Sequence, residues 1–326
     1  MKLYLGLTEN SAPHQTRIFA ETDGKLVDLN LLYAAYLAQS QGQKANAYGL
    51  AAFYFRESIA GFLQRGESAR IALEDALSFA RKTGAGIHGP AGEKVLYDFG
   101  EIRVLPPLQN PEKTVVIGFS DQARIEATPK AEIPAGFYKL PSTFVASGAP
   151  IIWPKFSEEI DCDACLALVV AKPARRIQPD QAWDYIAGVT LLLDITARDI
   201  NKREGLTRNN LLGKNFPSST SLGPALLLKV SKKDLYALQV ELALDGVLKQ
   251  RFNPQEGVFT IEQIISHWSL LGLNAGDILA IGASMALQRN RLQNPVRLNL
   301  GARIRCFSPA IGELSHLVTP SGGLRR

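Results

Sequence analysis

The chain has 326 residues, of which 46% are hydrophobic, and a formal net charge of +5 at pH 7. This length allows one large core or two ordinary cores, so we expect two domains. No apolar run approaches the roughly 18–20 residues of a membrane helix, and the N-terminus lacks the apolar stretch of a signal peptide, so we expect a cytoplasmic protein without a membrane partner. The Lys and Arg residues are scattered and form no known nucleic-acid module, which argues against nucleic acid as a partner.

Residues 1 to about 110 predict a small α+β domain. Short strands are expected over 2–7, 17–20 and 25–29, and amphipathic helices over 31–41, 53–63 and 69–81. His14 and His88 lie in predicted loops and are expected to be surface residues. Pro106-Pro107 and Asn110-Pro111 mark a linker, so the second domain should span 111–326.

The centre of the second domain combines a buried strand with charged residues. The β-branched and leucine-rich run Ile186–Leu193 predicts a strand that is buried on both faces and ends at Asp194. Arg198 and Lys214 follow, and Gly223-Pro224 predicts a turn into another apolar strand. Because lone charges are rarely left in a core, these residues form either a structural ion-pair network or a site for an anionic ligand.

The rest of the second domain is mainly β. A strand is expected over 114–119, a hairpin over 240–251 around Asp245-Gly246, and a strand over 278–282 after Gly276-Asp277. An amphipathic helix is expected over 260–271.

Several motifs occur in the order typical of one family. The segment LLLDITARDIN, followed by GKNF and SLGPALLL, resembles the signature of the fumarylacetoacetate hydrolase family. The segments PAGFYKLPSTFVASGAPII, LALDGVLKQ and LNAGDILAIG resemble further motifs of that family, so the resemblance runs from about Val115 to Val318. It implies a mixed β-roll in the second domain, a homodimer, and a pocket at the ends of the strands that carry Asp163 and Asp194.

The resemblance also implies a class of reaction. Members of the family hydrolyse carbon–carbon bonds of β-diketo acids, decarboxylate or isomerise 2-oxo dicarboxylates, or dehydrate sugar acids, through an enolate. We therefore expect a hydrolase, lyase or isomerase that acts on a small anionic 2-oxo or β-diketo carboxylic acid. The resemblance gives Lys214 and Arg198 as catalytic residues, and Lys139, Arg198, Asn201 and Ser284 as substrate-binding residues.

Two positions depart from the family pattern near the expected pocket. The loop SDQARIEATPKAEIPAGFYK contains no histidine, although the family usually has a catalytic histidine there. Glu126 could replace it as a base if burial raised its pKa, and the alternative is a solvated charged loop. The family's Thr-Gly-Thr turn is replaced by Ile281-Gly282-Ala283-Ser284, so its hydroxyl group has either moved by one residue, to Ser284, or been lost.

The metal site of the family is only partly present. Members bind Mg²⁺, Mn²⁺ or Ca²⁺ through a Glu-x-Glu pair and the strand-end Asp. The run EIDCDACLALVV places Asp163 and Cys165 at the pair, with Asp194 as the third ligand. Sulfur is a poor ligand for Mg²⁺, so we expect Mg²⁺ or Mn²⁺ to bind weakly or not at all. Cys162 and Cys165 should point to opposite faces of a strand, which argues against a shared metal site or a disulfide.

These departures leave two hypotheses. The chain is either an enzyme of the family with weak or absent metal binding, or a non-catalytic member that binds a small acid or forms a subunit of an assembly.

Overall fold

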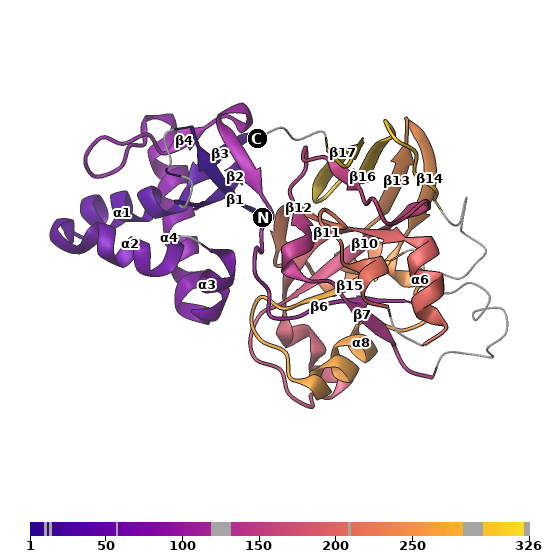
Figure 1. Ribbon diagram of the computed structural model, residues 1–326. Helices are drawn as coiled ribbons and strands as arrows, with labels where there is room; N and C mark the ends of the chain where they lie inside the picture. Colours follow the sequence, from indigo (N-terminus) through magenta and orange to yellow (C-terminus); the bar gives the residue numbers. More distant parts are fainter. Residues whose placement is uncertain are drawn as a thin grey trace. The chain divides into compact units, whose positions relative to one another are not determined.

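The computed structural model describes residues 1–9, 12, 15–56, 58–118, 132–207, 210–282 and 296–322. The chain forms two compact units, Met1–Gln109 and Asn110–Arg326 (Figure 1). In the described ranges, no helix has the length and apolar character that crossing a membrane requires.

The N-terminal unit combines a small antiparallel sheet with helices. Its strands are β1 (Lys2–Thr8), β2 (Arg17–Thr22), β3 (Lys25–Asp28), β4 (Leu96–Tyr97) and β5 (Ile102–Leu105). Strands β4, β3, β2 and β1 are neighbours in that order, and β5 also pairs with β1. The helices are α1 (Leu29–Ser40), α2 (Ala47–Phe55), α3 (Ile59–Gln64) and α4 (Gly66–Thr83), with 3₁₀ turns η1 (Lys44–Asn46), η2 (Gly84–Gly86) and η3 (Phe99–Glu101).

The prediction of one helix over 53–63 was wrong. Helix α2 ends at Phe55, and Arg56 is extended, with φ −87° and ψ 130°. Helix α3 then begins with Ser58 as its N-cap, because the Ser58 hydroxyl accepts a hydrogen bond from the backbone N–H of Gly61 at 2.8 Å. This local cap separates two apolar helices that look continuous in the sequence.

The C-terminal unit contains two sheets. Strands β12 (Thr220–Leu228), β11 (Ile186–Ala197), β10 (Ile160–Val170), β15 (Ile278–Gly282), β6 (Thr114–Ile117) and β7 (Gly136–Tyr138) are neighbours in that order, and β8 (Phe144–Val145) pairs with β12. The five-stranded sheet has the order β14 (Val247–Phe252), β13 (Val240–Leu244), β16 (Arg303–Ser308), β17 (Gly312–Pro320) and β9 (Ile151–Trp153). The helices of the C-terminal unit are α6 (Arg198–Gly205), α7 (Lys232–Ala237) and α8 (Ile261–Trp268), with 3₁₀ turns η4 (Pro141–Thr143), η5 (Pro179–Tyr185), η6 (Leu212–Lys214), η7 (Pro254–Glu256) and η8 (Ser269–Leu271). This mainly β unit and the α+β first unit agree with the predicted fold class.

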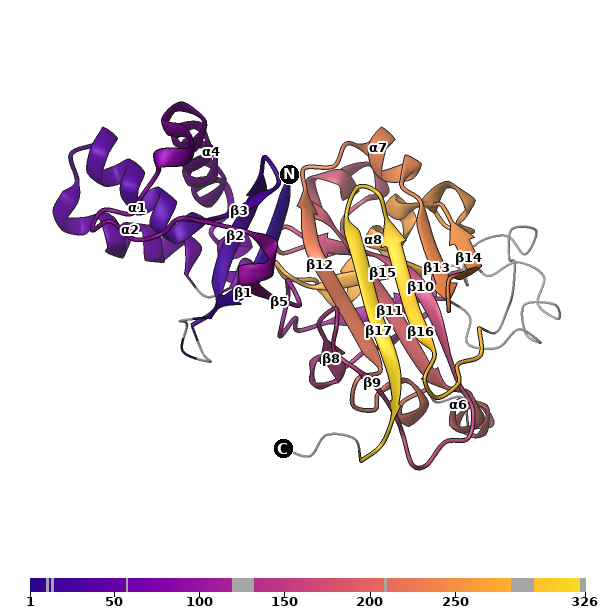
Figure 2. The same ribbon diagram turned by 90° about the horizontal axis from the view of Figure 1, so that it is seen from above.

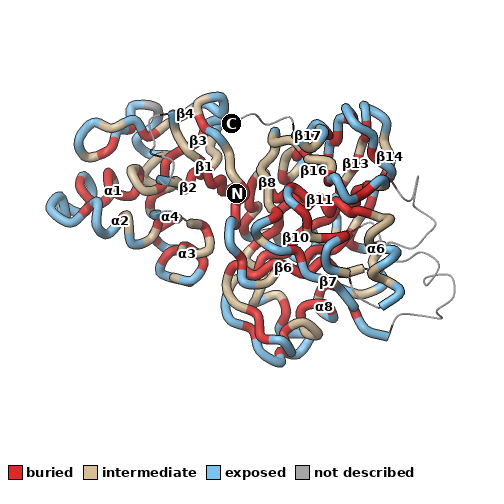
Figure 3. Tube along the Cα trace, in the orientation of Figure 1, coloured by how far each residue is buried: buried red, intermediate tan, exposed pale blue. Residues whose placement is uncertain are grey.

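The two sheets of the C-terminal unit pack against each other around an apolar core. Figure 2 shows β16 and β17 in front of β10 and β11, and both contact β11. Strand β10 is buried throughout and β11 from Gly188 to Ala197 (Figure 3). Leu166 and Leu193 of the first sheet share the core with Leu242, Ile304 and Leu314 of the second. Because side chains alternate along a strand, the other face of β10 and β11 is available for polar residues.

Two predictions about the central strands were wrong. Asp194 does not end its strand, since β11 continues to Ala197 and Asp194 is paired with Asp163 of β10. Gly223-Pro224 is not a turn but part of β12. The ladder between β11 and β12 shifts register between Val189 and Leu191, which accommodates a proline that has no N–H to donate.

Candidate functional site

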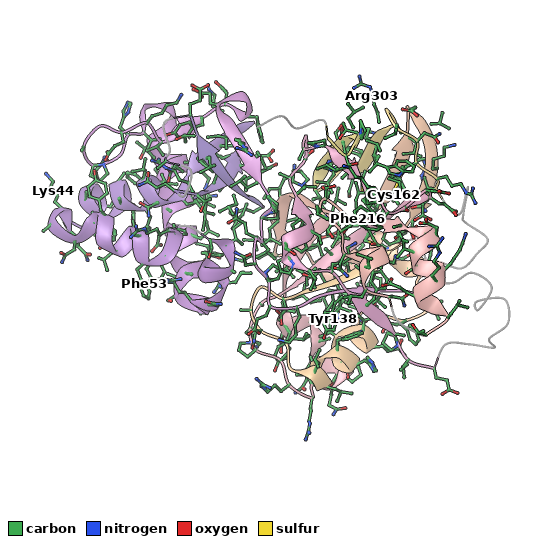
Figure 4. All side chains as sticks on the ribbon, viewed as in Figure 1. Lys44, Phe53, Tyr138, Cys162, Phe216 and Arg303 are labelled. Carbon is green, nitrogen blue, oxygen red and sulfur yellow. The ribbon has the colours of Figure 1, made fainter. Side chains whose placement is uncertain are left out.

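Three carboxylates lie on the polar face of β10 and β11. Asp161 and Asp163 are two residues apart on β10, and Asp194 lies opposite Asp163 on β11. All three residues are buried. Cys165 follows on the same face by alternation, whereas Cys162 belongs to the apolar core. Figure 4 marks Cys162 among the side chains of this unit.

Two buried lysines share Asp194 as their counter-ion. Lys139 follows β7, and its Nζ lies 3.0 Å from Asp194 Oδ1 and donates to the backbone carbonyls of Lys214 and Ser219. Lys214 is the last residue of η6, and its Nζ lies 2.7 Å from Asp194 Oδ2 and 2.7 Å from Thr196 Oγ1. The two ammonium groups therefore occupy both oxygens of one carboxylate.

The other two carboxylates face Arg198, the first residue of α6. Its Nε donates to Asp161, and a terminal nitrogen lies 3.8 Å from Asp163 Oδ2. Gln250 of β14 donates a 2.7 Å hydrogen bond to Asp163 Oδ1. Asp161 Oδ1 is buried and has no hydrogen-bond partner among the described residues. Three carboxylates thus meet three cationic side chains, and the cluster is close to neutral.

Burial and the neighbouring charges shift the ionisation of this cluster. Burial lowers the pKa of Lys139 to about 8, against the opposing effect of Asp194. Burial disfavours the charged form of Asp194, but Lys214 and Lys139 outweigh it and lower the pKa of that carboxyl. Burial raises the pKa of Asp161 to about 6, although Arg198 acts in the opposite direction. Burial also raises the pKa of the Cys165 thiol well above its usual value, so the sulfur is protonated at neutral pH.

Hydrogen bonds from outside the cluster hold the two lysines in place. The carboxylate of Glu204, on α6, accepts the backbone N–H groups of Leu211, Leu212 and Gly213 at 3.2, 2.7 and 3.0 Å. These three N–H groups form an anion-binding nest in the segment that leads to Lys214.

Asn215 links the two lysine segments. Its side chain accepts the N–H of Leu140 at 2.7 Å and donates to the carbonyls of Tyr138 and Leu211, both at 3.0 Å. Tyr138 and Leu140 flank Lys139 in the sequence, so one amide side chain couples the positions of both lysines. Tyr138 is labelled in Figure 4.

The structure brings together most of the predicted site residues. Lys139, Arg198, Lys214, Asp163 and Asp194 form the cluster, and their roles stay predictions. Asn201 is buried on α6 and packs against Gly213. A Cβ added to Gly213 would lie 2.8 Å from the backbone nitrogen of Asn201. Glu126 and Ser284 lie outside the described residues.

Sequence reasoning missed Asp161, Thr196 and Gln250. Asp161 could have been found, because it lies one strand period before Asp163 and therefore shares its face. Gln250 gave no local signal, since it comes from the second sheet and is 87 residues from Asp163 in the sequence.

The donor set does not suit a hard divalent cation. Mg²⁺ and Mn²⁺ need several oxygen ligands, and Asp163, Cys165 and Asp194 would have to supply them. Both oxygens of Asp194 already accept from ammonium groups, and one oxygen of Asp163 accepts from Gln250. Cys165 offers a protonated sulfur. These residues therefore do not fit the group that the resemblance implied.

Comparisons with known proteins agree with the motifs. Residues 113–319 match the family model described as fumarylacetoacetate (FAA) hydrolase C-terminal. The chain is 32% identical over 261 residues to a mitochondrial oxaloacetate tautomerase of Xenopus laevis, covering 79% of this chain and 77% of the relative. It is 30% identical over 231 residues to an oxaloacetate tautomerase of Bacillus subtilis strain 168, covering 68% of this chain and 75% of the relative.

Solved structures share the fold over nearly the whole chain. A fumarylacetoacetate hydrolase from Exiguobacterium antarcticum has a TM-score of 0.69 at 20% identity, covering 98% of this chain and 99% of that chain. A maleylpyruvate hydrolase from Sphingobium sp. SYK-6, solved with manganese(II) and pyruvate, has a TM-score of 0.68 at 18% identity with the same coverage. The sequence motifs, the family model and the shared fold agree: this chain belongs to the fumarylacetoacetate hydrolase family.

Proposed function

We propose that this chain is an enzyme that moves a proton between carbon and oxygen in a small 2-oxo carboxylic acid, as in keto–enol tautomerisation. The observation that carries the proposal is the cluster in which Lys139, Lys214 and Arg198 surround Asp163 and Asp194. The relatives that act on oxaloacetate support a dicarboxylate of this kind as the substrate. The other reactions of the family share the enolate, so hydrolysis, decarboxylation and dehydration belong in the same assay.

The exposure of the charged groups suggests how a substrate would be held. Arg198 is the most exposed cation of the cluster, with 15% of its side chain accessible, against 3% for Lys214 and 0% for Lys139. A guanidinium group binds a carboxylate through two parallel hydrogen bonds. Arg198 would therefore take the substrate carboxylate, and the carbonyl oxygen would lie towards the lysines.

The proposed proton transfer uses one base and one acid. A carboxylate takes the proton from the carbon next to the carbonyl, and the electron pair of that C–H bond forms the C=C bond while the carbonyl oxygen becomes negative. Asp163, with 11% of its side chain accessible, is the most exposed carboxylate of the cluster, and Glu126 is the second candidate. The Lys214 ammonium then donates a proton to the oxygen and gives the enol. A preorganised ammonium group stabilises such an oxyanion strongly in a dry site.

Removing the Lys214 ammonium tests the proposal. Turnover of oxaloacetate and of a panel of acylpyruvates would be followed by the absorbance of the enol, in metal-free buffer with chelator. Lys214→Met is expected to lower kcat by about 100-fold or more, as loss of an oxyanion donor does. Lys202→Met on α6 is the matched control, because Lys202 is exposed and pairs with Glu159. Unchanged turnover in Lys214→Met would remove Lys214 from the mechanism.

The closed ion-pair network favours a second candidate, a non-catalytic protein that binds a small acid. Each oxygen of Asp194 is bonded to an ammonium group, and Cys165 replaces a carboxylate of the family pattern. This candidate predicts no turnover across the panel, together with thermal stabilisation by a carboxylate that Arg198→Met abolishes. Efficient turnover would eliminate it.

We also propose that the chain acts as a cytoplasmic homodimer, as the family resemblance implies. Sedimentation equilibrium of the full chain tests the assembly, and a mass of one chain of 35.5 kDa would contradict it.

A further inference from the structure

The N-terminal unit contains two adjoining hollows that the proposed reaction does not use. The smaller hollow has a volume of about 280 Å³ and the wider hollow about 760 Å³. Thr16 and Arg56 line both hollows, so the two hollows adjoin. All the described residues that line them belong to this unit.

Arginine dominates the charge of these hollows. Arg56, Arg65 and Arg103 line the wider hollow, and none of its described lining residues is acidic. The smaller hollow adds Arg17 and one carboxylate, Asp28. Asp28 is fully buried, lies 2.7 Å from Arg17 Nη1 and caps helix α1, so its charge is already compensated.

The backbone and an aromatic ring hold the guanidinium group of Arg65 in place. Arg65 Nη1 donates a 2.6 Å hydrogen bond to the carbonyl of Gly61, and its guanidinium lies 4.6 Å from the ring centroid of Phe53, which Figure 4 labels. Gly61 permits this approach, because an added Cβ would lie 3.2 Å from Arg65 Nη1. The backbone of Arg103 pairs with that of Leu7 within the sheet, and the side chain of Arg103 is exposed.

Three arginines around a hollow whose described lining residues include no carboxylate favour an oxyanion. Guanidinium groups bind phosphate and carboxylate through paired, charge-assisted hydrogen bonds. Like charges gathered in a hollow also raise the local concentration of anions. Arg65 Nε is buried without a hydrogen-bond partner in the described residues, and Ser58, Gln64 and Gln109 add polar groups around the hollow.

We propose that the wider hollow of the N-terminal unit binds an oxyanion, which is the phosphate or carboxylate group of a small molecule, through Arg65 and Arg103 with Arg56 beside them. This site is independent of the carboxylate cluster on β10 and β11, and its existence does not depend on the proposed reaction.

Calorimetric titration of the full chain tests the site. The probes are inorganic phosphate, pyrophosphate and citrate, with sodium chloride at matched ionic strength as the blank. Wild type is expected to bind at least one probe with a saturable heat. Arg65→Gln and Arg103→Gln are each expected to raise the Kd of that probe by about 10-fold to 100-fold. Tighter binding of phosphate and pyrophosphate assigns a phosphate ligand, and tighter binding of citrate assigns a polycarboxylate.

Two further variants locate the binding. Arg81→Gln, an exposed change on α4, should bind as wild type does. Arg198→Met should also keep the binding, because Arg198 belongs to the other site. Thermal unfolding of each free variant checks that it folds. The proposal is overturned if no probe gives a saturable heat, if the folded Arg65→Gln and Arg103→Gln variants bind as tightly as wild type, or if Arg198→Met alone abolishes binding.

Discussion

Replacing Asp194 with Asn removes the counter-ion of two buried ammonium groups while it keeps the shape of the side chain. Lys139 and Lys214 would retain hydrogen bonds to Ser219, Thr196 and the backbone, but neither would have an adjacent negative charge among the described residues. Loss of one partner of a buried ion pair costs about 3–5 kcal/mol. For a unit of this size, each kcal/mol lowers the melting temperature by about 2–4 °C, so Asp194→Asn is expected to lower it by about 6–20 °C.

Calorimetric thermal unfolding and urea denaturation measure this effect. Asp184→Asn is the matched control, because Asp184 is exposed and its change should stay within about 0.5 kcal/mol. The double variant Asp194→Asn/Lys139→Met should lose less stability than the two single variants together, since contacting residues couple. A loss below about 1 kcal/mol in Asp194→Asn, or full additivity in the double variant, would refute the view that Asp194 compensates both lysines.

Three further outcomes are expected. Cys165→Glu restores an oxygen ligand, so Mn²⁺ at 100 times its Kd should stabilise this variant by about 2.7 kcal/mol, whereas wild type and Cys165→Gln should show no shift in thermal unfolding. Glu204→Gln removes the negative charge that binds the backbone N–H groups before Lys214, and it should lower the free energy of unfolding by about 1.5–3 kcal/mol in urea denaturation. An unchanged midpoint would show that these N–H groups do not need a charged acceptor. Burial opposes the ionisation of Glu262, but Lys232, Tyr236 and Trp183 outweigh it and lower the pKa of that carboxyl from 4.5 to about 2. The stability that this group contributes is therefore present above pH 4.5 and lost as the pH falls towards 2. In acid titrations, the free energy of unfolding of Glu262→Gln should therefore depend less on pH than that of wild type. An equal dependence in both proteins would contradict the role assigned to Glu262.

The sequence predicts the central strands well because their apolar pattern is local. The leucine-rich run Ile186–Leu193 predicts a strand buried on both faces, and β11 is buried from Gly188 to Ala197. Their register is not local, since it depends on which residues pair across two strands and on the core behind them. For this reason Asp163 and Asp194 were expected at one site, but their direct pairing and the extension of β11 beyond Asp194 were not.

Residues that favour turns or helix caps explain most of the other differences between the predicted and the observed elements. Gly223-Pro224 usually marks a turn, but an irregularity in the neighbouring ladder lets it lie within β12. Ser58 caps a helix in the middle of an apolar run, and this cap competes with continuation of α2. The closing of the ion-pair network by Gln250 depends on the packing of the second sheet, which no spacing in the sequence indicates.

The apolar core fixes the geometry of the candidate site through the alternation of β10. Ile160, Cys162 and Ala164 lie in the core, and Asp161 and Asp163 alternate with them on the opposite face. A slip of one residue would exchange these faces and move the carboxylates into the hydrocarbon core. An unpaired charge there is costly, so the packing of the leucines excludes a slip of one residue from the register that sets Asp163 opposite Asp194. The apolar face of β10, and not the charges themselves, therefore determines where the charged residues lie. For this reason the charged residues can stay close together while residues that would bind a metal or substrate change.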